Sequence, residues 1–211
     1  MLTSLIFKYF NLQHIIPALA TSHPFAVYGL LFLIIFIETG LVIMPFLPGD
    51  AILFLIGTLA TWQLQGVNLI LVILLLSLAA ILGDFVNFKI GQKFGVIFTQ
   101  SKFLPQKRLE QAQSFFQNYG ARAIILARFT PIMRTIVPFV AGMSRMPATK
   151  FIQTNMIGGV TWISLMTLAG FYFGSIPVIK SHFEFVVLAI VILSVLPMLI
   201  HRLSNRKVSH S

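Results

Sequence analysis

The sequence contains no cysteine among its 211 residues, and its histidines are scattered as His14, His23, His182, His201 and His210. Without thiols the chain has no disulfide, no thiolate nucleophile and no cysteine-ligated zinc or iron–sulfur centre. The histidine spacing provides no close ligand pair, which argues against a histidine metal site. We therefore expect no metal and no cofactor. Because no nucleophile has an obvious base beside it, we also expect no catalytic residues and no enzyme.

Charged residues are also scarce. They make up 9% of the chain, against 57% hydrophobic residues, and the mean hydropathy is +0.93. A soluble domain averages about 25% charged residues, so this composition indicates an all-α polytopic membrane protein. Acidic residues are rarest, with 5 Asp and Glu against 15 Lys and Arg, which gives a formal net charge of +10. The basic residues lie in loops between apolar segments rather than in one stripe, which argues against nucleic acid as a partner.

The segment from Arg128 to Arg134 brings two arginines into an otherwise apolar run. A guanidinium at membrane depth costs about 2.5–3.5 kcal/mol on insertion scales. Pro131 and Pro138 add two helix-breaking positions, because proline lacks a backbone donor. Charge and broken backbone at this depth are tolerated against protein or a water-filled cavity, not against lipid. The segment therefore indicates a site whose partners come from elsewhere in the chain.

The first part of the chain predicts an interfacial segment followed by a hairpin. Residues 1–24 mix apolar and polar positions and predict an amphipathic helix at the membrane surface. The next run, Phe25–Met44, has 20 residues and contains Glu38. After a Pro/Gly turn, the run Ala51–Trp62 has only 12 residues, or about 18 Å of helix against a hydrocarbon core of about 30 Å. We therefore expect a re-entrant hairpin with its turn at Pro45–Asp50.

The second part of the chain predicts full spans around another hairpin. The runs Val67–Phe98, Phe151–Phe173 and Phe183–Ile200 are long enough to cross a bilayer. A polar loop is expected from Thr99 to Gln113. The segment from Ser114 to Gly142 contains both breaks and predicts a second hairpin with short arms.

Basic residues set the expected orientation. The loop at 99–113, the turn at 145–150 and the polar tail at 201–211 carry Lys and Arg, which places all three in the cytoplasm. The second hairpin then opens to the cytoplasm and the first to the opposite side. The expected architecture is two facing re-entrant helical hairpins with about three full transmembrane helices. It divides into segment 1–24, a membrane core at 25–174, and a last helix with a basic cytoplasmic tail at 175–211.

A weak internal repeat links the two hairpins. Glu38 and Pro48 precede Arg128 and Pro138 by the same offset of 90 residues (128 − 38 and 138 − 48). A matched pair of interrupted apolar segments in two halves of a chain points to a transporter site.

Glu38 and Asp50 make the first hairpin acidic, whereas Arg128 and Arg134 make the second basic. If the tips meet near the midplane, each carboxylate lowers the cost of burying a guanidinium. One interpretation is a set of structural ion pairs that close the bundle. The other is a gated site for an anionic head group, since arginine binds phosphate through a planar fork and the helix N-termini after the breaks add partial positive charge. In that cycle, a proton taken up by a carboxylate frees an arginine for the ligand.

Asp84, which follows Gly83 in the first full span, allows two interpretations. It either faces the cavity as a proton relay or lies at the interface beside Lys89. Trp162 is expected to be an ordinary membrane aromatic.

Glycines at small-xxx-small spacing occur near the ends of two spans, as Gly91 and Gly95 and as Gly170 and Gly174. This spacing is more typical of close helix packing than of chemistry.

The joint pattern resembles the DedA family, also called SNARE-associated or VTT-domain proteins, over roughly Phe25–Gly174. The motifs that carry the resemblance are Glu38, Pro48-Gly49-Asp50, Gly83-Asp84 with Gly91, Arg128-Phe-Thr-Pro131 with Arg134, and Ala141-Gly142 with Met146. The resemblance implies bacterial inner-membrane proteins that move lipids between leaflets, notably the carrier undecaprenyl phosphate. It also implies that the important acidic and basic positions are Glu38, Asp50, Arg128 and Arg134.

We therefore expect a flippase that moves a phosphate-bearing lipid, with undecaprenyl phosphate as the first choice, coupled to protons and supporting envelope integrity. The expected partners are an anionic lipid, the membrane and protons. Substrate binding and proton coupling are expected at Glu38, Asp50, Arg128 and Arg134, with support from Pro48, Gly49, Gly83, Asp84, Pro131, Pro138 and Gly142. The alternatives are a proton-coupled small-molecule or cation antiporter, a phospholipid scramblase and a non-transporting assembly factor.

Overall fold

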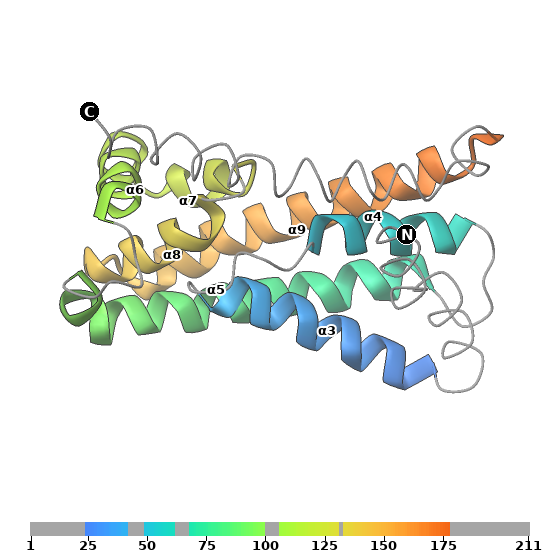
Figure 1. The fold of residues 1–211 in the computed structure, drawn as a ribbon, viewed down its shortest axis with the longest axis horizontal. Helices are drawn as coiled ribbons and strands as arrows, with labels where there is room; N and C mark the ends of the chain where they lie inside the picture. Colours follow the sequence, from blue (N-terminus) through green and yellow to red (C-terminus); the bar gives the residue numbers. More distant parts are fainter. Residues whose placement is uncertain (1–23, 42–48, 62–67, 100–105, 131–132, 178–211) are drawn as a thin grey trace, which may run out of the picture.

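The computed structural model describes residues 24–41, 49–61, 68–99, 106–130 and 133–177. Within these residues the chain is all-α, as expected, and forms seven helices (Figure 1). They are α3 (Pro24–Gly40), α4 (Gly49–Thr61), α5 (Leu69–Thr99), α6 (Gln106–Tyr119), α7 (Arg122–Ala127), α8 (Met133–Met143) and α9 (Ala148–Gly174).

Two of these helices are long and apolar enough to cross a membrane, α5 over Leu69–Gly95 and α9 over Ala148–Gly174. They pack against each other and run along the length of the molecule (Figure 1). Both correspond to predicted spans, which are confirmed. The third predicted span, Phe183–Ile200, lies outside the described residues, as do segment 1–24 and the basic tail.

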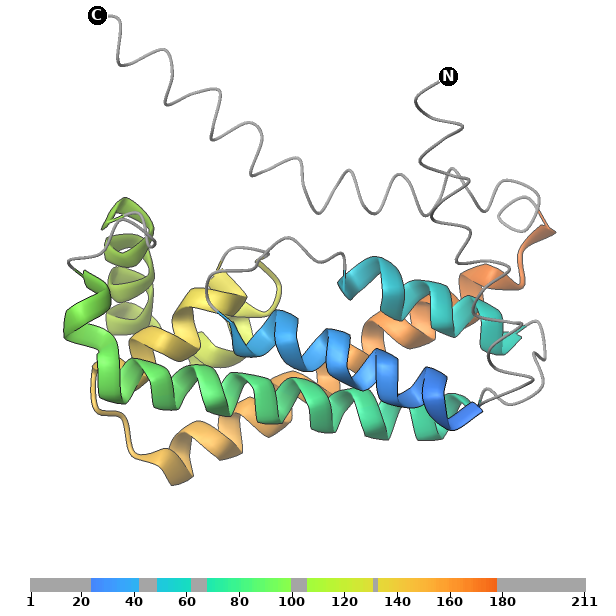
Figure 2. The same cartoon turned by 60° about the horizontal axis from the view of Figure 1, so that its bottom comes forward.

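The short helices pack on the long helix of the other half of the chain. α4 lies against α9 and α8 lies against α5, while α3 runs along α5 within its own half (Figure 2). α4 and α8 have 13 and 11 residues. At 1.5 Å per residue they extend about 20 and 17 Å, which is less than a hydrocarbon core of about 30 Å.

Glycines bring these helices close together in a repeated pattern. At four glycines, the first atom that an added Cβ would strike is a backbone carbonyl oxygen of the neighbouring helix. The colliding pairs are Gly91 with Phe139 and Gly142 with Phe88 between α5 and α8, and Gly170 with Phe54 and Gly57 with Thr167 between α9 and α4. The long-helix members are 79 residues apart (170 − 91) and the short-helix members 85 (142 − 57). The packing of the short helices on the long ones therefore repeats, but at offsets other than 90, and the repeat at the offset of 90 stays a prediction.

Pro138 lies inside α8 and does not end it, so the prediction of a second break at this position is wrong. Proline removes only the donor that would bond the carbonyl of Arg134, four residues earlier. The next carbonyl, of Thr135, accepts a hydrogen bond from Asn87 Nδ2 of α5 at 2.7 Å. A side chain of the neighbouring helix thus supports the backbone beside the proline.

The predicted polar loop at 99–113 is wrong from Gln106 onward, where α6 begins. Leu109 and Ala112 are buried and Phe116 packs beside them, so the apolar residues follow the spacing of an amphipathic helix. α6 lies crosswise to the long helices at one end of the bundle (Figure 2). Its polar outer face gives the segment the composition of a loop.

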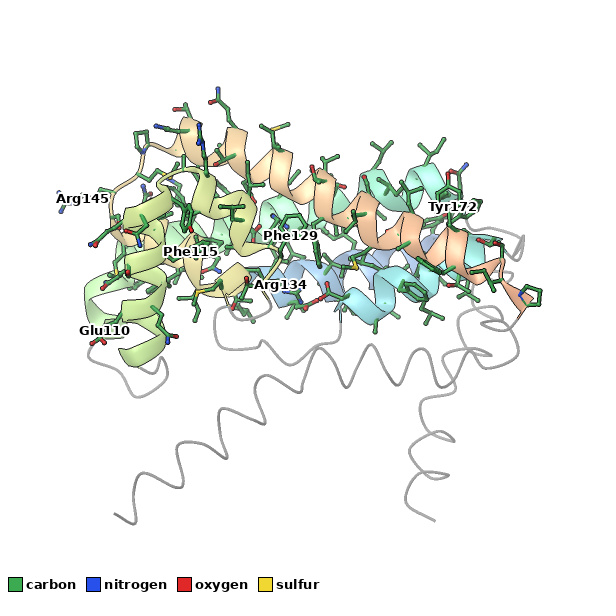
Figure 3. The ribbon with its side chains drawn as sticks, turned by 90° about the horizontal axis from the view of Figure 1, so that it is seen from above. Glu110, Phe115, Phe129, Arg134, Arg145 and Tyr172 are labelled. Atoms are coloured by element: carbon green, nitrogen blue, oxygen red, sulfur yellow. The ribbon has the colours of Figure 1, made fainter. Side chains whose placement is uncertain are left out.

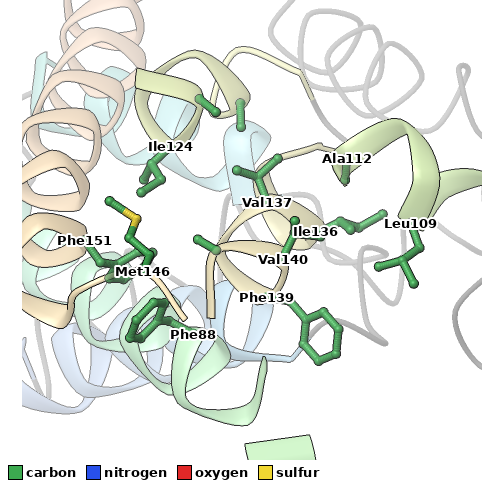
Figure 4. Close-up of a cluster of buried hydrophobic side chains, with 13 residues drawn as sticks. Phe88, Leu109, Ala112, Ile124, Ile136, Val137, Phe139, Val140, Met146 and Phe151 are labelled. Carbon is green, nitrogen blue, oxygen red and sulfur yellow. The ribbon is translucent and has the colours of Figure 1, made fainter. Parts of the chain in front are cut away.

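Two clusters of buried apolar side chains hold the bundle together. One joins α3, α4, α5 and α9, and the other joins the far ends of α5 and α9 to α6, α7 and α8 (Figure 4). In the second cluster Phe88 stacks on Phe151, with ring centroids 4.2 Å apart. Asp84 falls between the clusters along α5, and Asn155 falls between them along α9. The buried polar residues therefore lie near mid-length of the bundle.

Candidate functional site

Arg134 of α8 lies between two carboxylates from the first half of the chain. Its Nη1 donates to Asp50 Oδ1 at 2.6 Å, and its Nη2 donates to Glu38 Oε1. Both contacts are ion pairs. These residues are 84 and 96 positions away in sequence, so the folding of the bundle brings them together. One guanidinium thus binds both acidic residues of the first predicted hairpin.

The helix ends explain why the two acids meet. Glu38 lies in the last turn of α3, and Asp50 lies in the first turn of α4, where a negative charge suits the helix dipole. The backbone N–H of Gly49, the first residue of α4, donates to the Glu38 carboxylate. An N-terminal amide of α4 is therefore already occupied by a protein anion.

The basic partner comes from the equivalent place in the second half. α8 begins at Met133, so Arg134 projects from its first turn. Helices therefore begin just after both predicted breaks, at Gly49 and Met133. Pro48 and Pro131 themselves lie outside the described residues.

The Arg134 cluster is partly exposed at the protein surface. The side chains of Arg134 and Asp50 are 17% and 14% exposed, whereas that of Glu38 is 3% exposed. Arg134 is seen near mid-length of the bundle in Figure 3, away from both ends. A ligand could therefore reach the guanidinium, while Glu38 stays inside.

Arg128 is bound by a different set of side chains. Its Nη2 donates to the Asp84 carboxylate of α5 and to Asn155 Oδ1 of α9, the latter at 2.6 Å. The side chains of Arg128 and Asp84 are 6% and 4% exposed. The expectation that Arg128 faces Glu38 or Asp50 is therefore wrong. Arg128 follows α7, which packs mainly on α9, and α9 in turn packs on α5, the helix of Asp84.

Asp84 is consequently buried in an ion pair and does not pair with Lys89. The Lys89 ammonium instead donates to Gln92 at 3.1 Å on the exposed side of α5. The charge of Asp84 also acts on Arg134 of the other cluster without a direct contact. Of the two interpretations of Asp84, the structure keeps the inward-facing one, and its role as a proton relay stays a prediction.

Two of the predicted supporting glycines act in packing. A Cβ on Gly83 would collide with the Thr39 hydroxyl at the end of α3, and a Cβ on Gly142 would collide with the backbone of Phe88. Gly83 thus lets α3 approach α5 next to Glu38. The packing interpretation of the small-xxx-small glycines is confirmed by the contacts of Gly91 and Gly170 described above.

Two buried asparagines belong to the site and were not predicted. Asn155 accepts from Arg128 and donates from Nδ2 to the carbonyl of Ile81 at 3.1 Å, which joins α9 to α5. Asn87 donates to the carbonyls of Thr135 and Thr39, which joins α5 to α8 and α3. In the sequence, each of these asparagines is marked by no more than an uncharged amide within an apolar run.

Trp162 also contributes to the site. Its Nε1 donates to Asp50 Oδ1 at 3.1 Å, the same oxygen that accepts from Arg134. It is therefore more than the ordinary membrane aromatic that was expected.

Among the described residues, no group of three or more His, Asp or Glu side chains could hold a metal ion.

Comparisons with known proteins agree with these motifs. The VTT domain matches residues 47–172. The chain is 42% identical to Protein DedA of Escherichia coli (strain K12) over 184 residues, which cover 86% of this chain and 84% of that protein. It is 40% identical to an uncharacterized membrane protein of Mycobacterium tuberculosis over 171 residues, covering 80% of this chain and 75% of the relative.

A further relative is Inner membrane protein YghB of Escherichia coli (strain K12), 34% identical over 188 residues, or 87% of this chain and 84% of that protein. No solved structure matches the chain. None of the three relatives named here carries the name of an enzyme. By domain match and identity, the chain belongs to the DedA family of membrane proteins and carries its VTT domain.

Proposed function

We propose that this protein moves a phosphate-bearing lipid between the leaflets of the bacterial inner membrane, coupled to protons. The observation that carries the proposal is the partly exposed guanidinium of Arg134 held by two carboxylates. A planar guanidinium offers paired donors that suit phosphate as well as carboxylate. A lipid phosphate therefore competes for the same donors that Glu38 and Asp50 occupy.

The membrane arrangement under this proposal has α3 with α4 and α7 with α8 as two re-entrant hairpins. Their helix breaks meet near mid-length of α5 and α9, the two helices long enough to cross a membrane. Interrupted helices whose ends meet at the midplane are the usual place for a transporter site. The relative YghB is named an inner membrane protein. Under this proposal the basic loops and the tail face the cytoplasm, as the positive-inside rule predicts.

The cycle follows from the groups around Arg134. Protonation of Glu38 or Asp50 removes one of its ionic partners, and the guanidinium then takes the phosphate. Loss of the proton on the other side restores the ion pair and expels the ligand. Arginine itself keeps its charge throughout, because its pKa is too high for exchange at physiological pH.

The two interpretations of the buried charges then apply to different clusters. The Arg134 cluster is the ligand site, since its guanidinium is the more exposed one. The Arg128–Asp84–Asn155 cluster is buried and joins α7, α5 and α9. It acts as the structural ion pair that holds the break between α7 and α8 in place.

Undecaprenyl phosphate is the first lipid to test. The protein is reconstituted in liposomes with labelled undecaprenyl phosphate in one leaflet, with and without a pH gradient. Movement that requires the gradient and is lost in Arg134→Ala supports the proposal. Movement without a gradient indicates a scramblase, and cation or small-molecule flux without lipid movement indicates an antiporter. No movement of any phosphate lipid by folded protein contradicts the proposal.

A further inference from the structure

Two aromatic side chains beside the Arg134 cluster have no role in the proposed cycle. Phe129 directly follows Arg128 at the end of α7, and Trp162 lies in α9. Their rings meet edge to face, with centroids 5.2 Å apart and an interplanar angle of 83°. Figure 3 labels Phe129 and Arg134, both at mid-length of the bundle.

The aromatic pair is connected directly to the cationic centre. Trp162 Nε1 and Arg134 Nη1 donate to the same oxygen of Asp50, at 3.1 and 2.6 Å. The indole and guanidinium nitrogens therefore lie no farther apart than the sum of these distances. An apolar ring surface thus begins next to the group that we assign to the phosphate.

The Trp162 ring is partly buried, whereas the Phe129 ring is exposed. Trp162 is partly buried and packs against the core cluster of α3, α4 and α5, so its position is fixed. Phe129 is 52% exposed and lies at the break that follows α7. An edge-to-face pair is a favoured aromatic geometry, so the fixed indole holds the exposed phenyl ring in place.

We propose that Phe129 and Trp162 form an apolar wall that binds the first methylene groups of a hydrocarbon chain whose phosphate is on Arg134. The wall and the guanidinium together select an alkyl or polyprenyl phosphate over free phosphate. This inference rests on the proposed function, because it needs the phosphate at Arg134. It adds a protein contact that recognises the hydrocarbon chain of the lipid. It also gives the direction in which that hydrocarbon chain leaves the phosphate site.

The test measures binding of inorganic phosphate, ethyl phosphate and hexyl phosphate to the full-length protein in phosphatidylcholine nanodiscs. Isothermal titration is corrected with empty nanodiscs for partitioning. Each methylene that leaves water for the wall should strengthen binding about fourfold. We expect hexyl phosphate to bind at least about tenfold more tightly than inorganic phosphate, since several methylenes reach the wall.

Phe129→Ala should remove most of the gain with chain length and leave the affinity for inorganic phosphate unchanged. The matched control is Phe173→Ala, which removes a phenylalanine of nearly equal exposure, 51% against 52%, 11 positions along α9 from Trp162. Trp162→Phe keeps an aromatic ring in the wall and should retain the gain.

The outcomes separate the two proposals. Inorganic phosphate binding that persists in Arg134→Ala contradicts the assigned phosphate site. If phosphate binding needs Arg134 but does not strengthen with the length of the alkyl chain, the wall is contradicted and the phosphate site is not. The wall is also contradicted if Phe129→Ala keeps the full gain, or if Phe173→Ala loses as much as Phe129→Ala.

Discussion

Gly49 and Glu38 pack so closely that a Cβ on Gly49 would collide with the Glu38 carboxylate. The same glycine donates its backbone N–H to that carboxylate. The start of α4 therefore holds Glu38 from one side while Arg134 binds it from another. A larger residue here would have to displace the Glu38 carboxylate from the position in which these two groups hold it.

Gly49→Ala should displace Glu38 and weaken its bond to Arg134. Overpacking of this kind costs about 1–3 kcal/mol, so we expect transport to fall at least about tenfold, with a smaller loss of thermal stability. The control is Gly29→Ala in α3, where an added Cβ meets nothing within 4 Å. Lipid movement in liposomes provides the measurement. Equal activity of the two variants would show that the Gly49 contact does not matter.

Arg134→Lys should abolish the double ion pair although it keeps the charge. A lysine ammonium is a compact point charge and cannot reproduce the fork that binds two carboxylates with separate nitrogens. We expect transport to fall at least about tenfold, since one Glu38 or Asp50 bond is lost and the phosphate geometry with it. Arg122→Lys, on the exposed first residue of α7, should retain full transport. Wild-type rates in Arg134→Lys would exclude a role for the fork.

Asp84→Asn should destabilise the protein more than an ordinary surface change does. It leaves Arg128 as an uncompensated buried charge, which costs about 3–5 kcal/mol. Adding Arg128→Gln removes that charge and should restore part of the loss, so the two changes should be strongly non-additive. Thermal unfolding in detergent measures both, with Glu110→Gln on the exposed side of α6 as the control. Additive effects of Asp84→Asn and Arg128→Gln would contradict the pairing.

The sequence was sufficient to predict the long helices, the two helix starts and the Arg134 cluster. The long apolar runs that became α5 and α9 were predicted as helices, because only a helix satisfies so long an apolar backbone in lipid. The first broken segment carries the acids and the second carries the arginines, which favoured a fold in which the two segments meet. α4 and α8 accordingly begin at Gly49 and Met133.

The partner of Arg128 could not be predicted in the same way. Glu38, Asp50 and Asp84 are all candidate partners for Arg128 and Arg134, and several pairings satisfy the charges equally well. The pairing that forms depends on which helix α7 packs against, and that helix is α9. Asn155, which completes the pair, has no charge to mark it in the sequence.

Gly142→Ala should weaken the packing of α8 on α5, and Gly57→Ala should weaken the packing of α4 on α9. We expect the two changes to lower the free energy of unfolding by similar amounts. An added Cβ at Gly142 collides with the Phe88 carbonyl, and one at Gly57 collides with the Thr167 carbonyl. Both obstacles are helix backbone, which cannot turn aside as a flexible side chain does, so each change should cost about 1–3 kcal/mol or more.

Thermal unfolding of the detergent-solubilised variants measures these costs. Gly40→Ala serves as the control, because its nearest new neighbour is Gly83 at an ordinary contact distance of 3.5 Å. A large loss at Gly142 with none at Gly57 would mean that the α4–α9 interface is looser than the α5–α8 interface. The repeated packing requires both positions to be sensitive, because each short helix is held by the same glycine-to-carbonyl approach on the long helix of the other half.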